Sequence, residues 1–215
     1  ATVMSWRGTQ GGIEALKAGH DVIMCPVECY YIDYCQDAPF KEPVSIGGYT
    51  PLKTVYSYEP LESTVTPAEA EHLIGIQGNL WAEYITEDDH AEYMYYPRAF
   101  AVAETAWSKP EHKNYDDFQI RAAKLCHLFA KMGYKTFDLS NEFGERRESL
   151  VPITHLGKGC KVHYNIPYSK QWPGTGNETL TDGILGGWTY RGMKWQGTMK
   201  DLDVTIDLGK VQPIR

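Results

Sequence analysis

The alternation of short apolar segments with a helical segment at the start of the chain constrains the fold more than any other feature. Residues 2–6, 21–25 and 74–81 have the composition of buried strands, and residues 13–18 that of a short helix. Gly19 follows this helix at the position where a left-handed residue is favoured. Strands separated by helices commonly pair in parallel, so the pattern predicts βα units and a parallel sheet.

A long segment interrupted by prolines, about residues 27–65, lies between the second and third predicted strands. We predict a loop here, and loops of this length in compact domains are usually functional. Residues 66–69 form a capping-box pattern with proline at the first helical position, which predicts a short helix.

Two longer helices are predicted further along. Residues 86–107 favour a helix, which Pro97 would kink unless the part before it forms a separate turn. Asn114 is suited to cap a helix that continues to Met132. Its apolar side chains recur every three or four positions and predict one stripe that faces a core, namely Phe118, Ala122, Leu125, Phe129 and Met132.

The pattern changes around residues 140–158, and we place a domain boundary near Leu150. Beyond it the helical periodicity ends and glycine becomes frequent. Val204, Ile206 and Leu208 alternate with polar residues, as in an antiparallel sheet with one buried face. We therefore expect an α/β domain over residues 1–150 and an all-β domain over residues 151–215.

The composition argues against some classes of protein. A net charge of −7 disfavours nucleic acid, because such a surface repels phosphate. No apolar stretch approaches the roughly 20 residues that span a bilayer. The five cysteines lack the spacing of zinc ligands, so we expect buried free thiols, no metal site and no cofactor. Because the chain starts in a strand-like segment with no leader, we expect the natural polypeptide to extend beyond it at the N-terminus, and beyond Arg215 as well.

Aromatic and acidic residues follow each of the three predicted strands: Trp6, then Tyr31 and Asp33, then Trp81 and Glu83. In a βα-barrel the carboxyl ends of the strands open on one face, which holds the active site. Aromatic walls with a few carboxylates suit a pyranose sugar. Asp33 and Glu83 are candidates for the acid/base pair of a glycosidase. Alternatively each is a solvated loop carboxylate or, for Glu83, a charge at a helix N-terminus.

Three further charged or titratable residues attract attention, namely Arg7, His20 and Arg98. We expect all three to form ion pairs or hydrogen bonds at strand ends rather than to take part in catalysis. His20 precedes a predicted strand, which places it at the face of a barrel that serves stability.

Several separated motifs, in order along residues 1–140, resemble the family 20 glycoside hydrolases, which are β-N-acetylhexosaminidases. The motifs cover residues 4–8, 19–24, 31–36, 75–83, 93–98 and 103–108. The resemblance implies strands six to eight of a TIM (β/α)8 barrel. It also implies a retaining exo-enzyme that removes terminal β-linked N-acetylglucosamine or N-acetylgalactosamine from glycans, and a periplasmic, cell-surface or secreted location.

The resemblance further implies roles for individual residues. Trp6 and Trp81 would wall the subsite for the terminal sugar, and Tyr31 would hydrogen-bond the acetamido carbonyl oxygen. Asp33 and Glu83 would bind the outer hydroxyls of the sugar. In this family the substrate's own acetamido oxygen is the nucleophile, assisted by an Asp-Glu pair after strand four. This chain begins after that strand. We therefore expect it to be inactive alone, because a general acid contributes typically ~10²–10⁴-fold, and to need the rest of the enzyme to complete the barrel.

The second domain has a resemblance of its own. Residues 180–183, 195–197 and 204–209 resemble the opening half of a discoidin or coagulation-factor type C module, a jelly-roll sandwich. Asp182 lies in a turn that in such modules is often near a structural calcium, but we expect it to cap the turn. Two alternatives to the enzyme remain open: a sugar-binding protein that has lost the acid, and an adhesin whose barrel is a spacer.

Overall fold

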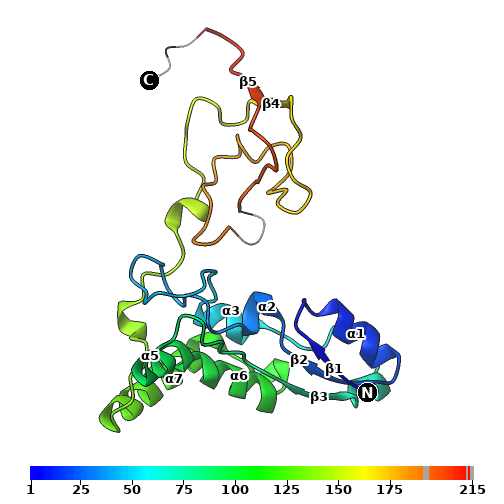
Figure 1. The fold of residues 1–215 in the computed structure, drawn as a ribbon, viewed down its shortest axis with the longest axis vertical. Coiled ribbons are helices and arrows are strands. Elements are labelled where there is room, and N and C mark those ends of the chain that lie inside the picture. Colours follow the sequence, from blue (N-terminus) through cyan, green and yellow to red (C-terminus); the bar gives the residue numbers. More distant parts are fainter. Residues whose placement is uncertain (191–193, 212, 214–215) are drawn as a thin grey trace. The chain divides into compact units, whose positions relative to one another are not determined.

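The computed structural model describes residues 1–190, 194–211 and 213, which form two compact units, Ala1–Phe143 and Gly144–Arg215. The first unit contains a three-stranded sheet in the order β1-β2-β3 (Figure 1). Its strands are β1 (Thr2–Ser5), β2 (Asp21–Met24) and β3 (Leu73–Ile76). Both pairings are parallel, which confirms the predicted α/β arrangement.

Helix α1 (Gln10–Lys17) connects β1 to β2 and packs on both strands (Figure 1). It buries Ile13 and Leu16 against Val22 and Met24, which form one apolar cluster. Gly12 allows this close approach, since a Cβ there would lie 2.5 Å from the Met24 sulfur. Gly19 ends the turn with φ +74°, in the left-handed region expected after the helix.

The third strand is shorter than the predicted segment 74–81. At Gln77 the backbone N–H bonds to the carbonyl of Met24, the last residue of β2, at 2.9 Å. Because β2 ends there, the chain continues beside residues 30–32 instead, through a single parallel bridge between Tyr31 and Asn79. The predicted strand therefore combines β3, which ends at Ile76, with a connecting segment that makes only an isolated bridge at Asn79.

The long segment before β3 is not all loop. It contains α2 (Val27–Tyr30) and α3 (Leu52–Ser57), and α4 (Pro67–Ala70) follows it. Apolar residues Leu52, Val55 and Tyr56 bury α3 in the larger core cluster. The predicted capping box is present in α4, where the backbone N–H groups of Thr66 and Glu69 each bond to the other's side chain.

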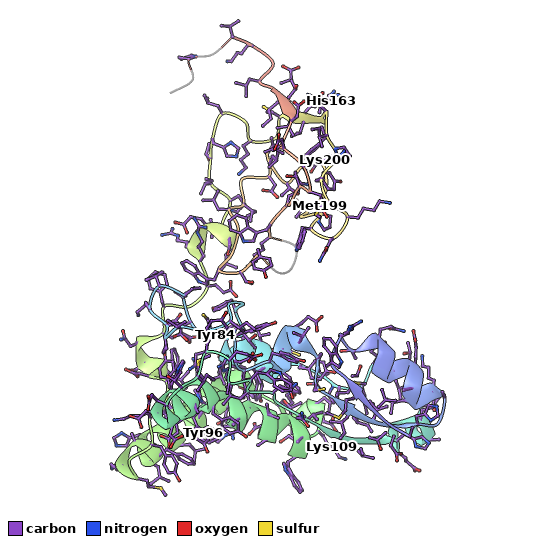
Figure 2. The ribbon with its side chains drawn as sticks, in the orientation of Figure 1. Tyr84, Tyr96, Lys109, His163, Met199 and Lys200 are labelled. Atoms are coloured by element: carbon purple, nitrogen blue, oxygen red, sulfur yellow. The ribbon has the colours of Figure 1, made fainter. Side chains whose placement is uncertain are left out.

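The predicted helix 86–107 is two helices, α5 (Asp88–Tyr95) and α6 (Arg98–Trp107), separated at a cis Tyr96-Pro97 bond. The part before Pro97 is thus a full helix rather than a short turn. Proline has no N–H to continue the helical ladder, which explains the break. Tyr96, labelled in Figure 2, packs its ring near those of Phe100 and Phe129.

Helix α7 (Tyr115–Lys131) begins at the predicted cap, where the Asn114 side chain accepts from the Asp117 N–H at 3.1 Å. Short 3₁₀ turns cover Pro110–His112, Leu139–Asn141 and Arg147–Ser149. The predicted stripe on α7 is correct in part, since Phe118 and Ala122 are buried. Leu125 and Met132 are 39% and 64% exposed, because the buried face is rotated toward Cys126 and leaves them at its edge.

In the second unit β4 (Lys161–Tyr164) pairs with β5 (Val204–Asp207) in antiparallel register. This pairing confirms an antiparallel strand near residue 204, but the alternation gives no buried face there, since Ile206 is 37% exposed. The two compact units divide between Phe143 and Gly144, a few residues before the boundary expected near Leu150. The chain before it already bonds to the second unit: the Leu185 N–H to the Glu148 carbonyl at 2.9 Å, and Arg146 to the Gly186 carbonyl at 3.1 Å.

All five cysteines are free, as predicted. Cys25, Cys29, Cys35 and Cys126 are buried, whereas Cys160 in the second unit is half-buried and therefore differs from the expectation. Among the helices of the described residues, none is long and apolar enough to cross a membrane.

Candidate active site

The carboxyl ends of the three strands are joined by backbone hydrogen bonds that continue beyond the strands. The Cys25 N–H bonds to the Ser5 carbonyl at 3.1 Å, and the Val27 N–H to the Trp6 carbonyl at 2.9 Å. Beyond β3, the Asn79 N–H bonds to the Tyr30 carbonyl at 2.7 Å. The residues that follow each strand are therefore fixed at one edge of the sheet, as the βα pattern predicts.

At this edge the structure brings Tyr31 and Trp81 together, although they are far apart in the sequence. The Trp81 side chain lies close enough to the Tyr31 hydroxyl to favour its ionised form, and the Tyr31 ring lies 6.1 Å from the Tyr34 ring. Burial raises the pKa of Tyr31, and the interaction with Trp81 acts in the opposite direction. The hydroxyl is therefore a neutral hydrogen-bond donor at physiological pH.

Asp33 is buried, with 4% of its surface exposed. The Arg98 guanidinium is close enough for the Asp33 carboxylate to raise the pKa of that arginine. This burial excludes the solvated loop carboxylate that remained an alternative for Asp33. A buried carboxylate beside a fixed cation has one preferred orientation, which suits recognition of a ligand hydroxyl.

Asn79 also lies at this edge; it is part of the 75–83 motif, but no role was predicted for it. It is buried, and its side-chain oxygen accepts from the Gln77 amide at 2.6 Å. A side-chain hydrogen bond with Asn79 also lowers the pKa of Cys25, against a larger rise caused by burial. The available signal was a polar residue in an otherwise apolar run between Gly78 and Leu80.

Trp6 and Trp81 leave 45% and 51% of their surfaces exposed. The Arg7 guanidinium lies 4.6 Å from the centre of the Trp6 ring, so Arg7 stacks on this tryptophan rather than forming the expected ion pair or strand-end hydrogen bond. The remaining exposed surfaces of the Trp6 and Trp81 rings can still receive the C–H face of a sugar.

Glu83 is exposed and lies in a bend after Trp81. Asp33 is buried whereas Glu83 is exposed, so the two carboxylates lie in different environments. The helix that follows starts at Asp88, with Asp88 and Asp89 as the acids of its first turn, so Glu83 is not the N-terminal charge of a helix. Its carboxylate faces solvent and is available to a ligand.

The other two candidates, His20 and Arg98, differ in their exposure to solvent. His20 is exposed just before β2, at the end of the strand opposite to the candidate site, as expected. Arg98 is fully buried and donates only to backbone carbonyls, which confirms a structural role.

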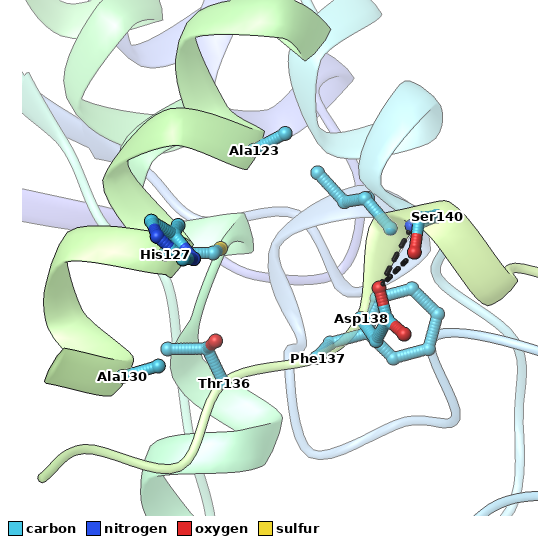
Figure 3. Close-up of a pocket in the computed structure, with 9 residues that line it drawn as sticks. Ala123, His127, Ala130, Thr136, Phe137, Asp138 and Ser140 are labelled. Carbon is cyan, nitrogen blue, oxygen red and sulfur yellow. Dashed lines mark hydrogen bonds between the residues drawn. The ribbon is translucent and has the colours of Figure 1, made fainter.

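A separate hollow of about 390 Å³ lies between α7 and the segment that follows it (Figure 3). Cys126, His127 and Phe137 line it, and Asp138 accepts hydrogen bonds there from Ser140. It contains none of the residues that follow the strands. Within the described residues, no three His, Cys, Asp or Glu side chains are grouped to hold a metal ion.

In the second unit Asp182 caps a turn, as expected. One of its carboxylate oxygens accepts from the Ile184 N–H at 2.7 Å, and the other accepts from the Thr175 hydroxyl at 2.9 Å. Both oxygens are thus occupied by groups of the same unit.

The fold and this edge define a class of protein: a parallel βα sheet with aromatic and acidic residues gathered at its carboxyl edge, where the βα-barrel enzymes have their active sites. Comparison with known proteins agrees. Residues 1–110 match the glycosyl hydrolase family 20 catalytic domain. The chain belongs to glycosyl hydrolase family 20.

The relatives are β-hexosaminidases. The chain is 46% identical over 127 residues to a β-hexosaminidase of Porphyromonas gingivalis, covering 59% of this chain and 16% of that protein. It is 32% identical over 124 residues to a β-N-acetylhexosaminidase of Cellulomonas fimi, covering 57% of this chain and 25% of that protein. The chain therefore spans a quarter or less of these two relatives.

A solved structure is also similar. The exo-β-N-acetylglucosaminidase of Vibrio harveyi, in complex with N-acetylglucosamine, superposes with a TM-score of 0.57 and 28% identity. The match covers 64% of this chain and 22% of that one.

Proposed function

We propose that the protein is a retaining exo-β-N-acetylhexosaminidase and that this chain supplies part of its sugar pocket. The observation that carries the proposal is the meeting of Tyr31 with Trp81 at the carboxyl edge of the sheet, beside the buried Asp33. The substrate would be a glycan with a terminal, non-reducing β-linked N-acetylglucosamine or N-acetylgalactosamine.

In this proposal each residue recognises one part of the sugar. Trp6 and Trp81 stack on its apolar ring faces, and the Tyr31 hydroxyl donates to the acetamido carbonyl oxygen. Asp33 and Glu83 accept hydrogen bonds from the outer hydroxyls. The raised pKa of Tyr31 supports its role as a donor, since the hydroxyl keeps its proton.

The chemistry follows from the acetamido group. Its carbonyl oxygen attacks the anomeric carbon while the glycosidic oxygen leaves with a proton from a general acid. Water then opens the resulting oxazolinium ring from the opposite face, which gives net retention of configuration. Tyr31 would hold the attacking oxygen in line with the anomeric carbon, a contact that matters most in the transition state.

The general acid is not among the residues of this chain in the proposed scheme. The family places it in an Asp-Glu pair, and no Asp-Glu dipeptide occurs in these 215 residues. The chain would therefore bind and orient the sugar, while the pair that cleaves it comes from elsewhere in the complete barrel. We further propose a periplasmic, cell-surface or secreted location, because the substrates of such enzymes are extracellular glycans.

For the second unit we propose a discoidin-like β-sandwich module. The antiparallel pair β4–β5 and the capped turn at Asp182 support this proposal. Such a module would hold the enzyme near its glycan without contributing to cleavage.

The test of the enzyme uses the full-length protein and two matched substrates. Nitrophenyl N-acetyl-β-glucosaminide should be hydrolysed, and nitrophenyl β-glucoside, which lacks the acetamido nucleophile, should not. N-acetylglucosamine-thiazoline, which imitates the oxazoline, should inhibit. Hydrolysis of both substrates at similar rates would contradict the mechanism. Sugar binding without hydrolysis would favour a non-catalytic carbohydrate-binding protein instead.

A further inference from the structure

We propose that Arg98 is the positioning residue of the sugar-binding loop, and that it holds Tyr31 and Asp33 in place through the backbone on either side of Asp33. The inference rests on the proposed function, because it concerns the same pocket. Arg98 does not reach the sugar, and it would act only through the loop.

The contacts of Arg98 support this role. One Nη atom donates to the carbonyls of Tyr34 and Thr50 at 2.8 and 3.0 Å. The other donates to the carbonyls of Ile32 and Met94. The Nε–H also donates to Met94, at 3.1 Å. The carbonyls of the residues before and after Asp33 are thus held by the same side chain.

Arginine is the only natural side chain that can make this set of contacts. Its guanidinium has five N–H donors in a rigid plane, and all five are used here. A lysine has three donors and would leave buried carbonyls without a partner, which is costly. The geometry therefore depends on the guanidinium and not simply on a positive charge.

The surroundings explain how a charged group is tolerated at a site with no exposed surface. Burial lowers the pKa of Arg98 to about 10, while Glu42 and Asp33 act in the opposite direction. Glu42 is itself held, since it accepts from the Tyr93 hydroxyl at 2.7 Å and from the Gln36 N–H at 3.1 Å. The guanidinium therefore stays protonated at neutral pH.

Backbone hydrogen bonds also fix the loop on either side of the part that Arg98 contacts. On one side the Ile32 N–H bonds to the Asn79 carbonyl at 2.8 Å. On the other side the Thr50 N–H bonds to the Cys35 carbonyl at 2.8 Å. Between these two backbone contacts, Arg98 holds the carbonyls of residues 32 and 34. Loss of the guanidinium would therefore remove the hydrogen bonds to the carbonyls on either side of Asp33 and loosen the part of the loop that carries it.

The experiment compares Arg98→Lys with Arg121→Lys in the full-length protein. Arg121 is an exposed arginine of the same unit, paired with Glu104 and Asp117, so its variant controls for the chemical change. We expect Arg98→Lys to lower kcat/KM for nitrophenyl N-acetyl-β-glucosaminide by roughly 10²-fold per active molecule, as for a small misplacement of a binding group. Arg121→Lys should stay within about twofold of the wild type.

A double-mutant cycle separates positioning from a general loss of stability. Because Arg98 would act through the loop that carries Asp33, the losses from Asp33→Asn and Arg98→Lys should overlap in the double variant. Additive losses would overturn the inference. So would an Arg98→Lys protein that melts earlier but keeps the wild-type kcat and KM per folded molecule.

Two further readouts keep the inference testable if activity or folding fails. Should the wild type show no acetamide-dependent hydrolysis, the proposed function fails. Amide exchange of residues 32–35 would still report whether Arg98→Lys loosens the loop. Should Arg98→Lys not fold, the side-chain ¹⁵N signals of Arg98 in the wild type should shift on saturation with N-acetylglucosamine while those of Arg121 do not. If the wild type is inactive, unchanged amide exchange in Arg98→Lys would contradict the positioning role. If Arg98→Lys does not fold, unchanged Arg98 signals in the wild type would contradict it.

Discussion

Substitution of Tyr31 by phenylalanine removes one hydroxyl from the candidate pocket and leaves the ring in place. The ring keeps its contact with Tyr34. The variant loses the interaction of the hydroxyl with Trp81, but the tryptophan is 51% exposed, so water can take the place of the hydroxyl. We therefore expect the free energy of unfolding to change by no more than about 0.5 kcal/mol.

The effect on catalysis should be much larger. In the proposed mechanism the hydroxyl donates to an acetamido oxygen whose charge changes as it attacks, and hydrogen bonds to charged groups contribute about 1.5–3 kcal/mol. Such a loss corresponds to a fall in kcat of roughly 10- to 10²-fold. KM should change less, because the contact is strongest in the transition state.

The assay is steady-state hydrolysis of nitrophenyl N-acetyl-β-glucosaminide by the full-length protein, together with a thermal melt. Tyr84→Phe is the matched control: Tyr84 is exposed, lies close in sequence to Trp81 and is labelled in Figure 2. It should behave as the wild type. An unchanged kcat in Tyr31→Phe, or a large fall in its melting temperature, would refute the reasoning.

Three other predictions concern the site, the stability and the chain as a unit. Glu83→Gln should raise KM by about tenfold with little change in kcat, because an exposed carboxylate that binds sugar hydroxyls serves the ground state and transition state alike; loss of kcat that is rescued by an activated leaving group would show a protonation role instead. Glu104→Gln should destabilise the protein by up to about 1 kcal/mol near neutral pH, because it breaks the paired hydrogen bonds with Arg121. Arg121 lowers the pKa of Glu104 below its ordinary value of 4.5, so this stabilisation is present above that value and is lost as the pH falls through the folded-state pKa. Urea titrations at about pH 7 and about pH 4 should therefore show a smaller difference between variant and wild type at the lower pH. The 215-residue chain expressed alone should release no nitrophenol, since its described sheet has three strands and cannot close a barrel; robust turnover would contradict this.

The sequence allowed the βα order to be predicted because its signals are local. Gly19 marks the end of α1, and Thr66 with Glu69 marks the start of α4. The end of β3 was not predictable in this way. It depends on where β2 ends at Met24, which the residues of β3 do not encode. Similarly, Leu125 fits the periodicity of α7, but the direction of the buried face is set by tertiary packing.

For the candidate site, the sequence located Tyr31, Asp33 and Trp81 at strand ends, which follows from topology alone. It did not reveal the side-chain contact of Tyr31 with Trp81, because that contact depends on the bridge to Asn79. It also left open whether Asp33 is solvated. That question is decided by burial against Arg98, from a helix far along the chain.

The burial of four thiols has a practical consequence for handling the protein. Burial raises the pKa of Cys25, Cys29, Cys35 and Cys126, so few thiolates are present near neutral pH. These cysteines should therefore react slowly with oxidants and alkylating reagents while the first unit is folded. Cys160 is less buried and lies in the other unit. A maleimide dye should thus attach at one place, and later modification of the remaining four would report unfolding of the first unit.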